Sequence, residues 1–430
     1  MKKKTTAIIL AAVLSCSGYP AAVQASEPPI TVFHFFEKEG SGPPGAFWKA
    51  AKRFQNDYPD IDMDFEFVAS TNYSEILNIM MAGNELPDIW LTKADLIPTL
   101  ADEGLILPAG NYVQEDPAWL DMYEDDVFLD STYKDTVWGI PYQIQSNCVG
   151  FYNESIFKEC GIDGWPDTIQ ELMEDCEKIK AAGYTPIALG NKDQWPAPST
   201  VLNTLVYKYV SRDWALSVVH NEGASFTDPE FIRALYGFKE LSEYFNVDMN
   251  SITQDEMESM FYNRKAAIFF CGAWAVGAVI QNCPVDVLAD THVALMPAVE
   301  GESGTVNDTA AGVGWNYVIR SDLSGERLDA ALAFIKTVTC GEYADDALKE
   351  GFFSAAKASE EAESAGGQHP LFEEYKKLAD QINYCSVLDC VLPAEVGSGV
   401  FPVDTQKLLI GEITPEAMAA DLQQIMEANY

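Results

Sequence analysis

The chain has 430 residues, of which 48% are hydrophobic and 12% aromatic, and its formal net charge at pH 7 is −39. A chain of this length and composition buries a large core and suffices for two domains, which excludes an intrinsically disordered protein. Its negative charge repels phosphate backbones and anionic lipid, which excludes nucleic acid and anionic membrane surfaces as partners.

The first 25 residues have the pattern of an export signal. Three lysines at positions 2–4 precede an apolar run at 7–14 that is too short to span a bilayer stably. Cys16 ends a Val-Leu-Ser-Cys stretch similar to a bacterial lipobox, in which the cysteine becomes the lipidated first residue. An ordinary cleavage site at 23–25 is the alternative, and Cys16 is then removed with the signal. Both alternatives predict an exported protein, either anchored through Cys16 to the outer face of the cytoplasmic membrane or released.

From residue 30 the chain alternates predicted strands and helices. The stretches ITVFHFF (30–36), DMDFEFV (62–68) and PDIWL (87–91) have the pattern of strands, and the segments between them have the apolar spacing of helices. This βαβαβ order predicts a mainly parallel sheet flanked by helices.

A second α/β unit follows residue 150. Its clearest element is a predicted helix at 168–183, with Thr168 and Glu171 as a capping-box pair and Gly183 at its end. Further helices are predicted at 228–245, 254–263, 326–338, 343–350 and from Thr414, and further strands at 185–190, 266–270, 292–297 and 316–320. The stretch AKASEEAESAGG (356–367) is predicted to be an exposed loop.

Motifs of catalysis and of cofactor or metal binding are missing from the sequence. The four histidines, at positions 34, 220, 292 and 369, are far apart, and none lies in an H-E-x-x-H motif. Gly312 and Gly314 lack the third glycine of a dinucleotide loop, and no P-loop or G-x-S-x-G motif is present. The sequence therefore predicts no metal site and no cofactor.

Eight cysteines lie outside the predicted signal, without the spacing of a metal site. The pairs Cys271 and Cys283, and Cys385 and Cys390, are close enough in sequence to form disulfides in an oxidising compartment. Small buried thiols are the alternative interpretation.

Four tryptophans lie where predicted strands end, beside glycine, proline or polar residues: Trp90, Trp195, Trp274 and Trp315. Ligands of open α/β sheets bind beyond the carboxyl ends of the strands. A flat apolar ring at that position covers the C–H face of a sugar, while polar neighbours bond its hydroxyls. Core packing is the alternative for each tryptophan alone, and four in comparable positions favour an aromatic-lined binding site.

Residues 138–190 resemble the central region of family 1 extracellular solute-binding proteins, the receptors of carbohydrate ABC importers. The F-Y-N-x-x-x-F core of that family's signature stands at 151–157, whereas Ile144 and Gly150 depart from it upstream. The stretches at 260–274, 313–322 with 328–338, and 409–426 resemble later segments of the same family in the same order, although Asn263 and Arg264 replace a usual glycine.

The resemblance implies a two-lobed α/β fold of the periplasmic-binding-protein type II, with the ligand between lobes that are joined by a hinge. It places the first lobe at 30–141 and 312–351 and the second at 142–311 and 352–430, after a signal region at 1–25. It implies a monomeric receptor that closes around a carbohydrate, expected to be an oligosaccharide, and delivers it to the membrane permease of an ABC transporter. It implies no covalent chemistry. A secreted carbohydrate-active enzyme and a receptor for a non-sugar solute are the alternatives.

Trp274 is the first candidate for the ring on which a sugar stacks, because the family places the aromatic of its G-x-W segment at the cleft. Trp195 and Trp315 are the next candidates. The candidates for contacts with sugar hydroxyls are Phe36, Glu37, Asp95, Asn147 and Asp389. These neighbours are acidic or neutral and so favour a neutral sugar over a phosphorylated one, while Asp88, at a strand start, is expected to be structural.

Overall fold

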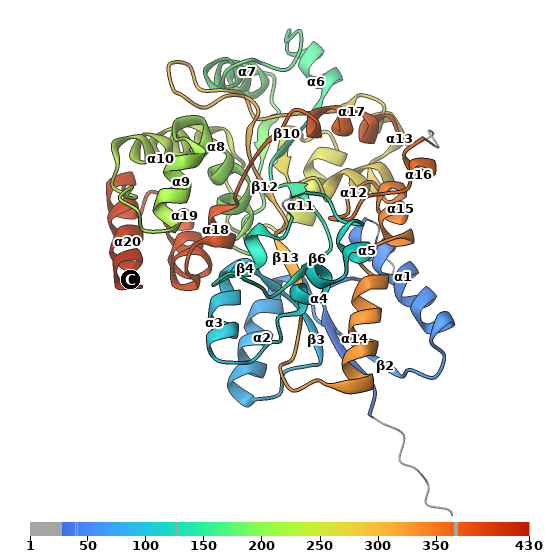
Figure 1. The fold of residues 1–430 in the computed structure, drawn as a ribbon. Coiled ribbons are helices and arrows are strands. Elements are labelled where there is room, and N and C mark those ends of the chain that lie inside the picture. Colours follow the sequence, from blue (N-terminus) through green and yellow to red (C-terminus); the bar gives the residue numbers. More distant parts are fainter. Residues whose placement is uncertain (1–27, 39, 41, 126, 365–368, 430) are drawn as a thin grey trace, which may run out of the picture.

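Figure 1 shows two lobes in the computed structural model, which describes residues 28–38, 40, 42–125, 127–364 and 369–429. The lower lobe in this view, here the first lobe, is built around a five-stranded sheet, and the upper lobe, here the second lobe, around a four-stranded sheet. The predicted signal and Cys16 lie outside the described residues. Within the described residues no helix has the length and hydropathy needed to cross a membrane.

The sheet of the first lobe has the strand order β2-β1-β3-β13-β6. Its strands are β1 (Ile30–His34), β2 (Met63–Phe67), β3 (Ile89–Lys93), β13 (Trp315–Ile319) and β6 (Ile140–Pro141). The opening βαβαβ unit is parallel, as predicted. The sheet as a whole is mixed, because β13 returns from the second lobe and runs antiparallel to both β3 and β6.

Helices cover both faces of this sheet and close a core that contains Phe33, Trp90 and Tyr317. Helix α1 shows why they form: Pro43 occupies its first turn, and Phe47 and Phe54 bury one face of the helix against α14 and α15. The helices of the first lobe are α1 (Pro43–Asp57), α2 (Ser70–Gly83), α3 (Ile97–Asp102), α4 (Ala109–Glu115), α5 (Pro117–Leu120), α14 (Gly325–Thr337) and α15 (Glu342–Lys349). A small hairpin joins β4 (Thr132–Tyr133) to β5 (Thr136–Val137), after the short helix η2 (Leu129–Ser131).

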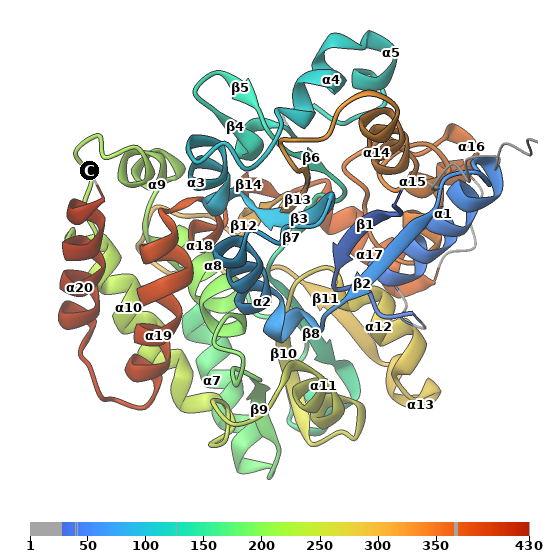
Figure 2. The ribbon, with the colours of Figure 1, turned by 90° about the horizontal axis from the view of Figure 1, so that it is seen from below.

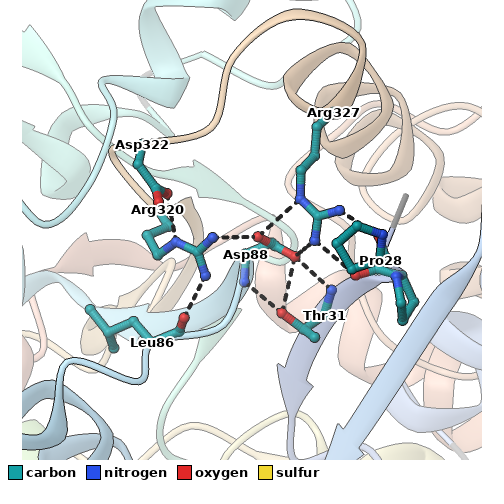
Figure 3. Close-up of polar contacts among 8 residues, drawn as sticks. Pro28, Thr31, Leu86, Asp88, Arg320, Asp322 and Arg327 are labelled. Carbon is teal, nitrogen blue, oxygen red and sulfur yellow. Dashed lines mark hydrogen bonds and ion pairs between the residues drawn. The ribbon is translucent and has the colours of Figure 1, made fainter. Parts of the chain in front are cut away.

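Asp88 ties together the starts of β1 and β3, two inner strands of the first-lobe sheet (Figure 3). Its side chain, 1% exposed, accepts hydrogen bonds from the backbone N–H (2.9 Å) and the hydroxyl (3.1 Å) of Thr31. Arg320 lies 2.9 Å from one of its oxygens, and Arg327 contacts both oxygens. Asp88 therefore has the structural role that the sequence predicts for it.

The sheet of the second lobe has the order β11-β8-β10-β9, with strands β8 (Val149–Asn153), β9 (Thr185–Ala188), β10 (Ala266–Cys271) and β11 (Thr291–Ala294). Every residue of β10 is buried, as expected for a central strand covered on both faces. Ile268 and Phe270 pack into the core on one side, and Phe269 packs into the core on the other.

Helix α7 (Ile169–Ala181) confirms the predicted capping box, because the Thr168 hydroxyl and the Glu171 carboxylate each bond the other residue's backbone N–H. The other helices of the second lobe are α6 (Glu154–Glu159), α8 (Asn203–Tyr209), α9 (Arg212–Val219), α10 (Pro229–Leu241), α11 (Gln254–Tyr262), α12 (Ala275–Asn282), α13 (Val285–Leu288), α17 (Pro370–Ala379), α18 (Leu388–Val391), α19 (Phe401–Leu409) and α20 (Pro415–Ala428), with the short η4 (Ser242–Tyr244) after α10. The predicted loop at 356–367 is partly helical, because α16 (Glu360–Ser364) forms within it.

A three-stranded sheet lies where the chain passes between the lobes (Figures 1 and 2). It has the order β14-β12-β7, with β7 (Gln145–Ser146), β12 (Asp308–Gly312) and β14 (Asn383–Cys385). The core of the first lobe includes residues just beyond two of the points at which the chain passes between the lobes. These residues are Tyr142 at one point, and Phe352 and Ala356 at another. Residues from three distant parts of the chain thus form the connection between the lobes.

The eight cysteines of the described residues are free thiols, and seven of them are buried. The two pairs that the sequence offered as disulfides, Cys271 with Cys283 and Cys385 with Cys390, are therefore not bonded. Burial raises the pKa of the Cys283 thiol to about 11, so this side chain is a neutral apolar group at physiological pH.

Candidate functional site

Trp274 lies three residues after the end of β10, at the residue before α12, and its side chain is half-buried. The indole covers Gly272, since a Cβ atom built on that glycine would lie 1.8 Å from a ring atom of Trp274. The buried strand fixes the backbone on one side, and the first turn of α12 fixes it on the other. The absence of a side chain at Gly272 therefore leaves the space that the ring occupies, and part of the ring stays exposed.

Replacing Gly272 by alanine is expected to displace the indole of Trp274, because the new methyl group and the ring cannot occupy the same space. Overpacking of this kind costs about 1–3 kcal/mol. Near-ultraviolet circular dichroism and thermal unfolding measure the two effects. Gly164→Ala is the matched control, since a Cβ there meets no atom within 4 Å. An unchanged near-ultraviolet spectrum for Gly272→Ala would contradict this packing.

Trp195 lies beside Trp274, with the ring centroids 5.8 Å apart and the ring planes inclined by 52°. Trp195 is half-buried and stands in the loop after β9, where Gln194 adopts the left-handed conformation with φ of 67°. The side chain of Asn191 accepts a hydrogen bond from the N–H of Ala197 at 3.0 Å and so closes this loop. The structure therefore brings two of the predicted tryptophans together.

The tryptophan pair lies at the boundary between the lobes. The first turn of α12 touches the first lobe, since a Cβ on Gly277 would lie 2.3 Å from the carbonyl oxygen of Glu350. A Cβ on Gly42 of the first lobe would lie 3.8 Å from the carbonyl oxygen of Trp274. Glycine at position 277 lets the two backbones approach closely, whereas Gly42, whose backbone has a φ of 67°, is in ordinary contact with Trp274.

Asp389, on α18 of the second lobe, is held by the segment that follows Trp195. This segment begins with the π-helix η3 (Ala197–Leu202), a rare conformation that is frequent at functional sites. The hydroxyl of Ser199 donates to one carboxylate oxygen of Asp389 at 2.5 Å, and the amide of Asn203 donates to the other at 2.6 Å. Asp389 is 2% exposed, and these two hydrogen bonds fix its carboxylate.

Lys93, the last residue of β3 in the first lobe, faces Asp389 across the boundary, with its ammonium 3.8 Å from the carboxylate. Burial acts to lower the pKa of the ammonium, but the charges of Cys390, Asp389 and Asp95 together outweigh it and raise the pKa. Lys93 is therefore a cation at all physiological pH values.

Asp95 lies in η1 (Ala94–Leu96), directly after β3, and is 5% exposed. One carboxylate oxygen accepts a hydrogen bond from the hydroxyl of Ser398 at 2.6 Å, and Ser398 belongs to a second π-helix, η5 (Glu395–Val400), in the second lobe. Burial raises the pKa of the Asp95 carboxyl above its ordinary value. Lys93, Asp95, Asp389 and Ser398 are called the seam cluster below.

Trp315 joins the seam cluster to the aromatic residues of the first lobe. The Lys93 ammonium lies 5.8 Å from the centre of its ring, and the rings of Phe35 and Tyr73 lie 4.9 and 5.5 Å away. Trp315 is half-buried, and Gly314 before it has a φ of 72°, a conformation that favours glycine. Three tryptophans and a set of hydrogen-bonding groups therefore lie along the boundary between the lobes.

Other predicted residues lie elsewhere. Phe36 is 1% exposed and packs against Phe47 and Tyr142 in the first-lobe core, and Trp90 is fully buried. Phe35, rather than Phe36, lies beside Trp315, with the ring centroids 4.9 Å apart. Glu37 is exposed beyond the end of β1.

Asn147 lies in the segment that connects the lobes and is 7% exposed. Its backbone N–H donates to the carbonyl of Ala310 in β12 at 2.8 Å. The residue before it, Ser146, accepts a hydrogen bond from the N–H of Ala273 at 2.9 Å, which places Asn147 near the backbone that carries Trp274.

Sequence reasoning missed four polar residues of this arrangement: Lys93, Ser199, Asn203 and Ser398. A signal for Lys93 was available, because it stands at the carboxyl end of β3 two residues before the predicted Asp95. The other three lie in η3, α8 and η5, whose positions depend on the packing of distant segments.

Comparisons with known proteins agree with this architecture. A family model described as bacterial extracellular solute-binding protein matches residues 40–339. An uncharacterized ABC transporter extracellular-binding protein of Pyrococcus horikoshii is 27% identical over 256 residues, 58% of this chain and 56% of the relative. The multiple sugar-binding protein of Streptococcus mutans is 24% identical over 294 residues, 65% of this chain and 64% of the relative. The chain thus spans between about half and two thirds of the length of these relatives.

Among solved structures, a chitin oligosaccharide binding protein superposes with a TM-score of 0.83 at 21% identity, over 93% of this chain and 98% of the other. A likeness at this level of identity establishes the two-lobed α/β fold.

Proposed function

The chain belongs to the bacterial extracellular solute-binding proteins, and on this premise we propose that it is the receptor of an ABC importer that captures a saccharide between its two lobes. The observation that carries the proposal is the line of half-buried aromatic rings and polar groups along the lobe boundary. Trp274 and Trp195 supply faces for sugar rings, and Trp315 supplies a third face in the other lobe. Several aromatic positions favour an oligosaccharide over a single sugar.

The proposed binding residues come from both lobes, so that a saccharide between them favours closure. Trp274, Trp195 and Asp389 act from the second lobe, and Trp315 and Asp95 act from the first. We also propose Glu37 and Asn147 as contacts for hydroxyl groups of the saccharide. Phe36 instead packs in the core of the first lobe. Charge-assisted hydrogen bonds contribute about 1.5–3 kcal/mol each.

The proposal includes delivery of the saccharide to a membrane permease by an exported, monomeric protein. The family to which the chain belongs is one of extracellular binding proteins. Cys16 is proposed as the lipid anchor on the outer face of the membrane. The lobes are assigned as residues 30–141 with 312–351, and 142–311 with 352–430.

Thermal unfolding of the purified protein with glucose, maltotriose, cellotriose, xylotriose and chitotriose tests the proposal. A ligand at 100 times its Kd stabilises by about 2.7 kcal/mol. At about 2–4 °C per kcal/mol, this corresponds to a rise in Tm of roughly 5–11 °C. The glycan recovered afterwards is expected to be intact, without new reducing ends. Cleavage of the glycan would identify an enzyme, and no shift with any saccharide would direct the search to non-sugar solutes.

A further inference from the structure

The seam cluster joins the two lobes by direct contacts between charged and polar side chains. Lys93 and Asp95 follow β3 in the first lobe, and Asp389 and Ser398 belong to α18 and η5 in the second. The Lys93 ammonium lies 3.8 Å from Asp389, and the Ser398 hydroxyl donates to Asp95 at 2.6 Å. Both contacts cross the boundary, so separation of the lobes breaks both.

Lys93 and Asp389, the charged pair of the seam cluster, each also contact residues of their own lobe. Asp389 is held by hydrogen bonds from Ser199 and Asn203. Lys93 is held beside the ring of Trp315. Because these contacts restrict both side chains, little side-chain freedom is lost when they pair, which strengthens the contact.

The pairing of Lys93 with Asp389 is also shielded from water. The side chain of Asp389 is 3% exposed and that of Lys93 is 19% exposed. By comparison, the ion pair of Lys49 with Glu350 joins α1 to the end of α15 within the first lobe, and the Lys49 side chain is 49% exposed. Charge pairs interact more strongly where solvent is excluded.

We propose that Lys93 is a positioning residue that latches the two lobes together through Asp389, with Asp95 and Ser398 as the second arm of the latch. The inference rests on the proposed function, because it assigns a role in binding to the closure of the lobes. A saccharide enters and leaves only when the lobes part, so the latch slows both steps. Latched and open forms exchange whether or not a saccharide lies between the lobes.

The latch makes a kinetic prediction that a direct ligand contact does not make. Loss of a contact to the saccharide raises the dissociation rate and leaves the association rate unchanged. Loss of the latch raises both rates together, since the open form becomes more populated in the free and in the bound protein. The Kd then changes much less than either rate.

The first test uses Lys93→Met, which keeps a long apolar side chain and removes the charge. Small-angle X-ray scattering of the protein without saccharide is expected to give a larger radius of gyration than wild type. Lys178→Met, which removes the ion pair of Lys178 with Asp175 inside α7 of the second lobe, is the matched control and is expected to leave the radius unchanged. An unchanged radius for Lys93→Met overturns the latch. This arm needs no saccharide, so its result is independent of the proposed function.

The second test is stopped-flow fluorescence with the trisaccharide of the panel above that gives the largest rise in Tm. For Lys93→Met both the association and the dissociation rate are expected to rise about tenfold, which corresponds to about 1.4 kcal/mol, with a change in Kd below about threefold. A rise in the dissociation rate alone overturns the latch and leaves a saccharide receptor. Ser398→Ala breaks the second arm and is expected to shift both rates in the same direction, and equal rates in Ser398→Ala and wild type limit the latch to Lys93 and Asp389.

Discussion

Replacing Trp274 by alanine is expected to raise the Kd for the bound saccharide by about 30- to 700-fold while leaving the unfolding temperature of the free protein nearly unchanged. Truncation of a central aromatic contact costs about 2–4 kcal/mol of binding free energy, and each 1.4 kcal/mol is about tenfold in Kd. The ring is half-buried and covers Gly272, so its removal opens no large cavity in the core. Isothermal titration calorimetry and thermal unfolding of the same sample measure the two effects.

Trp165→Ala is the matched control for this experiment. Trp165 is also half-buried, but it packs against Tyr152 at 5.1 Å and Phe270 at 6.1 Å, and its indole N–H donates to the carbonyl of Leu295 at 2.9 Å. Its loss is expected to lower the unfolding temperature and to preserve binding. If Trp274→Ala instead gave a large loss of stability with intact binding, Trp274 would be a residue of the core and the proposed site would be wrong.

Local signals in the sequence predict elements that local physics determines. The pair Thr168 and Glu171 predicts the start of α7, because a capping box involves only residues of the first turn. The apolar run of β10 predicts a buried strand for the same reason, and the βαβαβ order predicts the parallel pairing of β1 with β2 and β3.

The parts that depend on the return of the chain could not be predicted in this way. Strand β13 comes back from the second lobe and makes the first-lobe sheet mixed. The strands β7 and β14 have two and three residues, too few for a recognisable alternation. The connection between the lobes therefore had no signature of its own.

The same distinction between local and distant interactions applies to the candidate site. Trp195 and Trp274 were found because they follow strands, β9 and β10, and a strand end is visible in the sequence. The expectation is wrong for the other two tryptophans, because Trp90 lies inside β3 and Trp315 begins β13. Pairing of Lys93 with Asp389 joins residues 296 positions apart, and Ser398 reaches Asp95 over 303 positions. Phe36 was chosen instead of Phe35 because an apolar run does not show which face of the strand each ring occupies.

Replacing Asp88 by alanine is expected to destabilise the protein by about 3–5 kcal/mol, because the change leaves two guanidinium groups without their shared buried carboxylate. Arg320 and Arg327 both pair with Asp88, and the Thr31 backbone and hydroxyl donate to it. At about 2–4 °C per kcal/mol, the expected fall in Tm is roughly 6–20 °C. Thermal unfolding measures it.

Asp322→Ala separates the effect of burial from the effect of charge. Asp322 also pairs with Arg320, at 2.6 Å, but its side chain is 70% exposed, so water replaces the lost contact. Exposed ion pairs contribute about 0–1 kcal/mol, and the Tm of this variant is expected to stay within a few degrees of wild type. Asp88 lies at the end of the sheet where the inner strands β1 and β3 begin, whereas the proposed site lies where they end. Saccharide affinity measured below the Tm is therefore expected to survive Asp88→Ala. Equal losses of stability in the two variants would show that the buried carboxylate has no special role in holding β1, β3 and α14 together.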